Sequence, residues 1–155
     1  MVEQLPKPDE PRLITVANQK GGVGKTTTAV NLSAALAEVR NILLVDLDPQ
    51  ANASSGVGVV DPERTVYDVI AGRSSARQAV SRTAIQNLDL LAASADLAGA
   101  AVELDASRDN MLLLSRGLMG VRPNYDFIVI DAPPSVGALT LNALAAADLL
   151  IVPLQ

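Results

Sequence analysis

The chain has 155 residues, of which 49% are hydrophobic but only 2% aromatic, so it can bury one aliphatic core. It contains no cysteine and no histidine, which excludes disulfides, thiolate or imidazole metal sites and Ser-His catalysis. The net charge of −5 argues against a strong nucleic-acid-binding face. The sequence has neither an apolar run of roughly 18 residues nor a signal peptide, and both absences predict a cytoplasmic protein.

In chain order, β-branched runs alternate with segments of helical spacing. The proline-rich residues 1–11 predict a disordered lead-in, and residues 12–155 predict one domain. The predicted strands are 12–18, 41–48, 88–93, 125–134 and 148–154, and the predicted helices are 24–39, 66–71, 76–84, 109–120 and 137–147. This alternation indicates an α/β fold in which helices flank a parallel β-sheet. We expect residues 51–65 to contain turns, and Asn41 to end the first helix in the left-handed conformation.

A glycine-rich segment, ANQKGGVGKTT at residues 17–27, joins the first predicted strand to the first predicted helix. Its glycines allow successive backbone N–H groups to surround a phosphate chain at the N-terminus of the helix. The segment fits the phosphate-loop pattern G-x-x-x-x-G-K-[ST], except that Gln19 stands where the first glycine belongs. The residues predicted to bind nucleotide are Lys20, Gly21, Gly22, Val23, Gly24, Lys25, Thr26 and Thr27.

Acidic residues follow two of the predicted strands. Asp131 ends the apolar strand in FIVIDAPP, and we expect it to hold Mg²⁺ through a water molecule while Thr26 binds the ion directly. Asp46 and Asp48 in VDLDPQ lie at the end of the second strand. An acid near the γ-phosphate can orient the attacking water, so Asp48 is the predicted catalytic carboxylate and Gln50 is the alternative.

Several blocks of the sequence resemble the ParA/Soj branch of the ParA/MinD family, the deviant Walker A ATPases of the P-loop NTPase fold. The blocks are KGGVGKTT, LLVDLDPQ, TVYDVIAG, LAASADLAGAAVEL and YDFIVIDAPPSVGALTLNALAAADLLIVPLQ, in family order. By this resemblance the family domain continues for roughly another hundred residues. The sequence ends just past its last predicted strand. We therefore expect a C-terminally truncated domain, the N-terminal portion of a ParA-type ATPase.

The resemblance also implies roles for individual residues. Lys20 matches the signature lysine that reaches ATP bound in a partner subunit, so it is both a catalytic and a nucleotide-binding candidate. Asp48 matches the water-activating acid, with Asp46 as its companion in the first switch, and residues 131–135 match the second switch. Asn18 and Asn52 fall in matching blocks without a defined role.

The expected function is therefore ATP binding and hydrolysis in chromosome or plasmid segregation, through an ATP-dependent homodimer that uses ATP and Mg²⁺. The family implies a ParB-like stimulating protein, and non-specific DNA binding and nucleoid association in the full-length protein. For this acidic chain we expect weak or no DNA binding, no membrane binding, and hydrolysis that is weak or inactive. The alternatives are a MinD-like membrane-cycling ATPase and a nucleotide-binding fragment without turnover.

Overall fold

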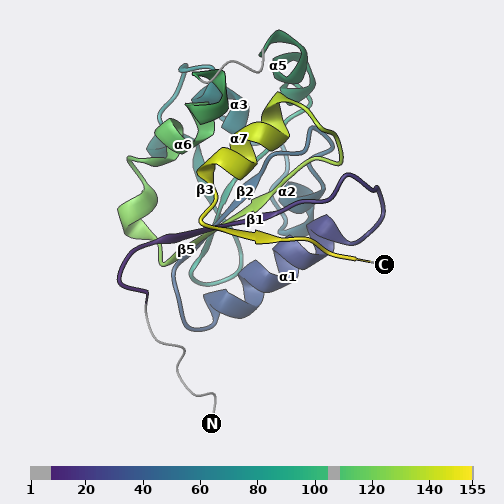
Figure 1. Cartoon of the computed structure of the whole chain (residues 1–155). Helices are drawn as coiled ribbons and strands as arrows, with labels where there is room; N and C mark the ends of the chain where they lie inside the picture. Colours follow the sequence, from purple (N-terminus) through teal and green to yellow (C-terminus); the bar gives the residue numbers. More distant parts are fainter. Residues whose placement is uncertain (1–7, 105–108, 155) are drawn as a thin grey trace.

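The computed structural model describes residues 8–104 and 109–154, and these residues form a single mixed sheet covered by helices on both faces (Figure 1). The strands within this part are β1 (Arg12–Val16), β2 (Ile42–Asp46), β3 (Val80–Arg82), β4 (Leu88–Leu91), β5 (Phe127–Asp131) and β6 (Leu149–Ile151). The α-helices are α1 (Lys25–Ala37), α2 (Asn52–Gly56), α3 (Val66–Ile70), α4 (Ala76–Ala79), α5 (Leu97–Glu103), α6 (Leu113–Leu118) and α7 (Ala138–Ala146). Two 3₁₀ turns are η1 (Asn110–Leu112) and η2 (Arg122–Asn124).

The strands lie in the order β3-β4-β2-β5-β1-β6, and all neighbours are parallel except β3 and β4. Strand β5 is therefore placed between β1 and β2, although it comes long after both in the chain. Its last residue, Asp131, is in register with Val16 of β1 and with Asp46 of β2. The carboxyl ends of the three central strands thus meet at one edge of the sheet, where open α/β sheets bind their ligands.

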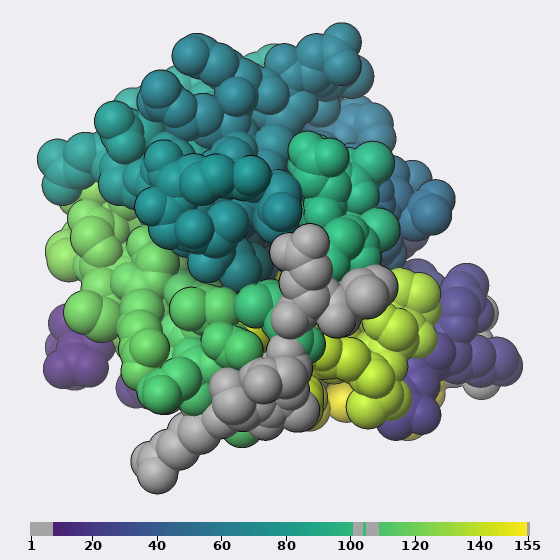
Figure 2. All heavy atoms as spheres, turned by 90° about the horizontal axis from the view of Figure 1, so that it is seen from above, coloured from purple at the N-terminus to yellow at the C-terminus, as the bar shows by residue number. Residues whose placement is uncertain are grey.

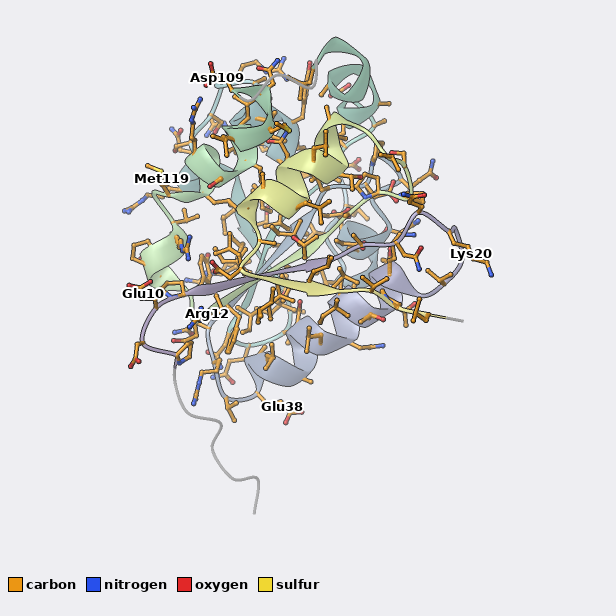
Figure 3. All side chains as sticks on the ribbon, in the orientation of Figure 1. Glu10, Arg12, Lys20, Glu38, Asp109 and Met119 are labelled. Carbon is orange, nitrogen blue, oxygen red and sulfur yellow. The ribbon has the colours of Figure 1, made fainter. Side chains whose placement is uncertain are left out.

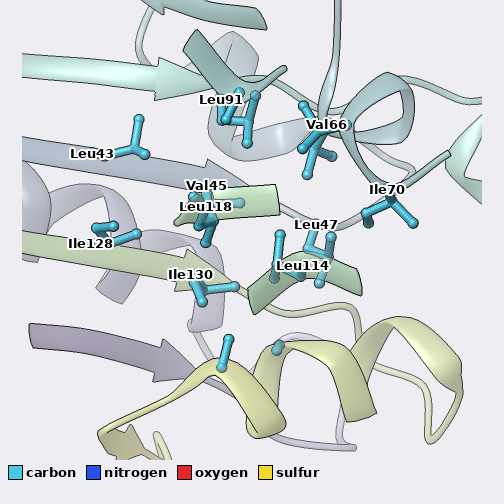
Figure 4. Close-up of a cluster of buried hydrophobic side chains, with 14 of the residues drawn as sticks. Leu43, Val45, Leu47, Val66, Ile70, Leu91, Leu114, Leu118, Ile128 and Ile130 are labelled. Carbon is cyan, nitrogen blue, oxygen red and sulfur yellow. The ribbon is translucent and has the colours of Figure 1, made fainter. Parts of the chain in front are cut away.

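Successive side chains of the central strands point to opposite faces of the sheet and pack into two hydrophobic cores. On one face, Leu43, Val45 and Ile130 pack with apolar residues of α3, α6 and α7 (Figure 4). On the other face, Leu44 and Val129 pack against α1 and α2. Both faces are buried, which explains why β2 is apolar at every position before Asp46.

The predicted alternation of strands and helices is confirmed, but the segment 76–84 differs from its prediction. That segment was expected to be a helix, but only Ala76–Ala79 is helical, and Val80–Arg82 forms the antiparallel edge strand β3. A capping box between Ser75 and Gln78 stabilises this single turn. Short helices α2 and α5, in segments without a predicted helix, were missed.

The end of α1 also differs from the prediction. Asn41 does not adopt a positive φ; the asparagine that does is Asn87, at φ 61°. The Asn87 side chain donates a 3.0 Å hydrogen bond to the carbonyl of Ala37, the last residue of α1. A cap from a residue distant in the sequence therefore satisfies a carbonyl at the end of this helix.

Of the predicted lead-in 1–11, residues 1–7 lie outside the described part, and the carbonyl of Pro11 accepts a hydrogen bond from Arg122. At the other end, edge strand β6 and the residues around it expose apolar side chains: Val136, Leu144, Leu149, Leu150, Val152 and Leu154. No helix in the described ranges is both long enough and apolar enough to cross a bilayer.

Candidate nucleotide site

The glycine-rich segment forms an open loop between β1 and α1, at the carboxyl edge of the sheet. Gly22 and Gly24 have φ values of 74° and 84°, in the left-handed region that favours glycine. A Cβ added at either position would meet no atom within 4 Å. Backbone conformation, rather than crowding within the chain, therefore requires glycine here, and the space above the loop is free to accept a ligand.

Lys25 begins α1 and is only 7% exposed. Its Nζ donates a 3.1 Å hydrogen bond to the carbonyl of Lys20, so the ammonium lies against the inside of the loop. The backbone N–H of Lys20 in turn donates to Oδ1 of Asn18, at 3.0 Å, and Nδ2 of Asn18 donates to the carbonyl of Pro153, at 2.8 Å. The backbone of Lys20 is thus held at both its N–H and its carbonyl, while its side chain extends into solvent (Figure 3).

A pocket of about 360 Å³ lies over the loop. Its lining combines the loop with three other polar residues and one proline: Gly21, Gly22, Gly24, Lys25, Thr26, Thr27, Asp48, Gln50, Asn52 and Pro134. Most predicted nucleotide-binding residues are therefore brought together, but Lys20 and Val23 do not line the pocket. Val23 is 3% exposed and anchors the loop instead. In the space-filling view, the loop and α7 lie side by side at one end of the molecule (Figure 2).

Asp131 is buried beside this pocket, and neither of its carboxylate oxygens has a hydrogen-bond partner in the described part of the chain. Burial raises its pKa to about 7, and Asp46 and Asp48 add to the rise. The Thr26 hydroxyl, which lies close to the carboxylate without hydrogen-bond geometry, and the Lys25 ammonium oppose it. Desolvation destabilises the carboxylate form of a buried acid, and a nearby cation restores it. The unpartnered oxygens next to Thr26 therefore fit a hydrated divalent cation better than they fit a structural role.

The two acids of VDLDPQ differ sharply in their surroundings. Asp48 lies at the pocket wall, and its Oδ1 accepts a 2.9 Å hydrogen bond from the N–H of Gln50. Asp46 is fully buried and accepts hydrogen bonds from the N–H of Asp48 and from Ser54. Burial raises the pKa of Asp46, against the opposing effect of these hydrogen bonds. Sequence reasoning missed Ser54, because no local pattern links a serine after a turn to an acid eight residues earlier.

The acids at this edge do not form a metal cage of their own. Within residues 8–104 and 109–154, no group of three or more acidic side chains is arranged to hold a metal ion. Mg²⁺ takes few ligands from protein and the rest from water and phosphate oxygens, so the Thr26 hydroxyl with Asp131 is a sufficient protein contribution. The donor set therefore suits a magnesium ion that arrives together with a nucleotide.

Comparison with known families agrees with this geometry. A family model described as an AAA domain, AAA_31, matches residues 11–155. The Bacillus subtilis sporulation initiation inhibitor protein Soj is 47% identical over 147 residues, which cover 93% of this chain and 58% of that protein. The Treponema pallidum chromosome-partitioning ATPase Soj is 50% identical over 145 residues, covering 93% of this chain and 57% of that protein.

Among solved structures, the chain is similar to a Mycobacterium smegmatis protein named cobyrinic acid a,c-diamide synthase, with bound ATP analogue and magnesium. The TM-score is 0.88 and the identity 43%, over 93% of this chain and 60% of that one. The chain therefore spans about 60% or less of the length of these relatives.

Proposed function

The chain belongs to the ParA/Soj family of P-loop ATPases, and we propose that it binds ATP with Mg²⁺ and hydrolyses it to ADP and phosphate. The observation that carries this proposal is the pocket over the glycine loop, which has the buried Lys25 ammonium at its base and the unpartnered Asp131 beside it. One fixed cation and one unsatisfied carboxylate suit a ligand that brings both phosphate charge and a divalent ion.

Binding rests on the loop. The N–H groups of residues 21–26 and the N-terminus of α1 would surround the phosphate oxygens, where the helix dipole favours negative charge. The Lys25 ammonium would exchange its bond to the Lys20 carbonyl for the β- and γ-phosphates. Thr26 would bind Mg²⁺ directly and Asp131 through water, and the ion would offset charge on the phosphates.

Hydrolysis rests on Asp48. Its carboxylate lies at the pocket wall and would hold a water molecule in line with the γ-phosphorus. The oxygen of that water bonds to phosphorus, the bond to the β-phosphate oxygen breaks, and the products are ADP and phosphate. Lys20 would then supply a cation to ATP held by a partner subunit, since its side chain extends away from its own pocket.

The biological role that we propose is chromosome or plasmid partition. Both curated relatives carry the name Soj, and one is named as a chromosome-partitioning ATPase. The name of the Mycobacterium protein describes a different whole-protein activity, but its structure holds an ATP analogue with magnesium. The Treponema ATPase and the Mycobacterium structure have nucleotide chemistry in common, and partition is the narrower inference. It carries with it an ATP-bound homodimer, a ParB-like stimulating partner and DNA binding by the full-length protein.

The test is ATP titration of the chain with and without Mg²⁺, followed by measurement of phosphate release. We expect Mg²⁺-dependent ATP binding and slow turnover. ATP binding without any phosphate release would instead support the alternative function, a nucleotide-binding module without turnover. Absence of Mg²⁺-dependent ATP binding would overturn the proposal.

A further inference from the structure

We propose that Asp46 and Ser54 form a buried clamp that positions Asp48 for hydrolysis, so that Asp46 acts through Asp48 and never touches water or nucleotide. This inference rests on the proposed ATPase function and adds the device that orders its catalytic carboxylate. It concerns a pair of residues that are eight positions apart in the sequence and that join the end of β2 to α2.

Every polar atom of the Asp46 carboxylate is engaged within the chain. Oδ1 accepts a hydrogen bond of 3.2 Å from the N–H of Asp48, and Oδ2 accepts two from Ser54, at 2.8 Å from its N–H and 2.7 Å from its hydroxyl. The side chain is 0% exposed and does not line the pocket. Asp131, by contrast, is also buried but leaves both oxygens unpartnered. The engaged acid therefore suits positioning, and the unpartnered acid suits a ligand.

Ser54 ties the clamp to the rest of the sheet. Its hydroxyl donates to Asp46 and accepts a 3.1 Å hydrogen bond from the N–H of Ala93, just beyond the end of β4. The hydroxyl is thus satisfied as donor and as acceptor in a site where the residue is only 2% exposed. One side chain joins β2, α2 and the end of β4, so its loss would loosen all three connections at once.

The segment between the two ends of the clamp carries the catalytic candidate. The carbonyl of Asp48 accepts a hydrogen bond from Ala51, and its Oδ1 accepts one from Gln50, which closes a tight turn. Ala51 has φ 53°, a left-handed conformation that a non-glycine residue adopts at an energetic cost. A strained turn persists only where its surroundings enforce it, and the clamp holds Asp48 at the start of the turn and Ser54 three residues beyond Ala51.

The test begins with backbone hydrogen exchange of residues 48–54 in the nucleotide-free chain, which does not depend on activity. We expect Ser54→Ala to increase exchange across this segment, and Ser54→Thr, which keeps the hydroxyl, to retain much of the protection. The matched control is Ser33→Ala, because Ser33 is a fully buried serine in α1 whose hydroxyl has no partner in the described residues. Unchanged exchange in both Ser54→Ala and Asp46→Asn would overturn the clamp.

The second step separates positioning from general destabilisation. We expect Ser54→Ala to reduce kcat about tenfold while ATP affinity stays within about twofold, because Lys25 and the glycine loop are untouched. Ser54→Thr should recover most of the turnover. Loosened exchange with wild-type kcat would overturn the positioning role. Failure of the wild-type chain to bind ATP, with exchange altered as expected, would overturn the proposed function while supporting the clamp.

Discussion

The two lysines of the glycine loop are five residues apart and lie in opposite environments. Lys25 is 7% exposed and donates to a carbonyl of its own loop. Lys20 has its backbone fixed on both sides, but its side chain is exposed, and its ammonium has no partner within the part of the chain that the structure describes. A cation in water gains little from distant charges, so Lys20 contributes little to a pocket it does not line.

This chain therefore supplies the Lys25 cation to its own pocket and presents the Lys20 cation outward. The hydrogen bonds to its backbone fix where the Lys20 side chain starts, and its exposed ammonium can reach a ligand bound by another molecule. This arrangement supports the proposed role of Lys20 at a partner's nucleotide. Four experiments test this contrast between the two lysines and the acids that share the pocket edge.

The first experiment removes the buried cation. Lys25→Ala should lower ATP affinity by about 100-fold or more, since charge-assisted hydrogen bonds to two phosphates are lost. Isothermal titration with a non-hydrolysable ATP analogue measures the effect. Lys20→Ala is the matched control and should keep affinity within about twofold. Wild-type affinity in Lys25→Ala would end the assignment of the loop as the phosphate site.

The second experiment keeps binding and removes the proposed water-orienting group. Asp48→Ala should bind ATP with nearly wild-type affinity but lose turnover by about 100-fold, the usual contribution of a positioned acid or base. Phosphate release under single-turnover conditions is the measurement. Gln50→Ala is the comparison, because Gln50 lines the same pocket. Normal hydrolysis by Asp48→Ala together with slow hydrolysis by Gln50→Ala would transfer the role to Gln50.

The third experiment tests Lys20 across an interface, in a full-length protein of this family. Lys20→Ala should spare nucleotide binding by the monomer and reduce ATP-dependent dimerisation and hydrolysis by about tenfold. Mixed with Lys25→Ala, it should regain activity, because the ATP of the Lys20→Ala subunit then faces the partner's intact signature lysine. No recovery, in a sample where mixed dimers are demonstrated, would show that Lys20 acts within its own subunit.

The fourth experiment uses the pH dependence of stability without nucleotide. The pKa of Asp131 is about 7, far above its unfolded value of 3.8, so the folded state binds more protons between these limits. The protonated Asp131 therefore stabilises the fold most below about pH 4, and this contribution falls by about 4 kcal/mol as the pH rises through 7. Asp46 contributes in the same direction. Urea unfolding of Asp131→Asn should show a smaller loss between pH 5 and 8, and an unchanged slope would contradict the burial of a titrating Asp131.

Much of the candidate site could be predicted from sequence because its features are local. Gly22, Gly24 and Lys25 are close in the chain, and their spacing already implies a left-handed loop followed by a helix. Asp131 was recognisable because it ends an apolar run that only a buried strand explains. Where the local signal was weak, prediction failed: Val80–Arg82 forms a strand by pairing with β4, an interaction that its own residues do not encode.

Contacts between residues far apart in the sequence could not be predicted from local patterns. Sequence alone determined that the chain carries a phosphate loop and acids that follow strands. That β5 lies between β1 and β2 became known only from the tertiary structure; this strand order brings Asp131 into register with Asp46, 85 positions earlier in the chain. Only the tertiary structure showed that Asp46 is held by Ser54 while Asp131 is left without partners. The physical reason is that strand order and hydrogen bonding of buried groups depend on how remote segments pack, and no short pattern records that packing.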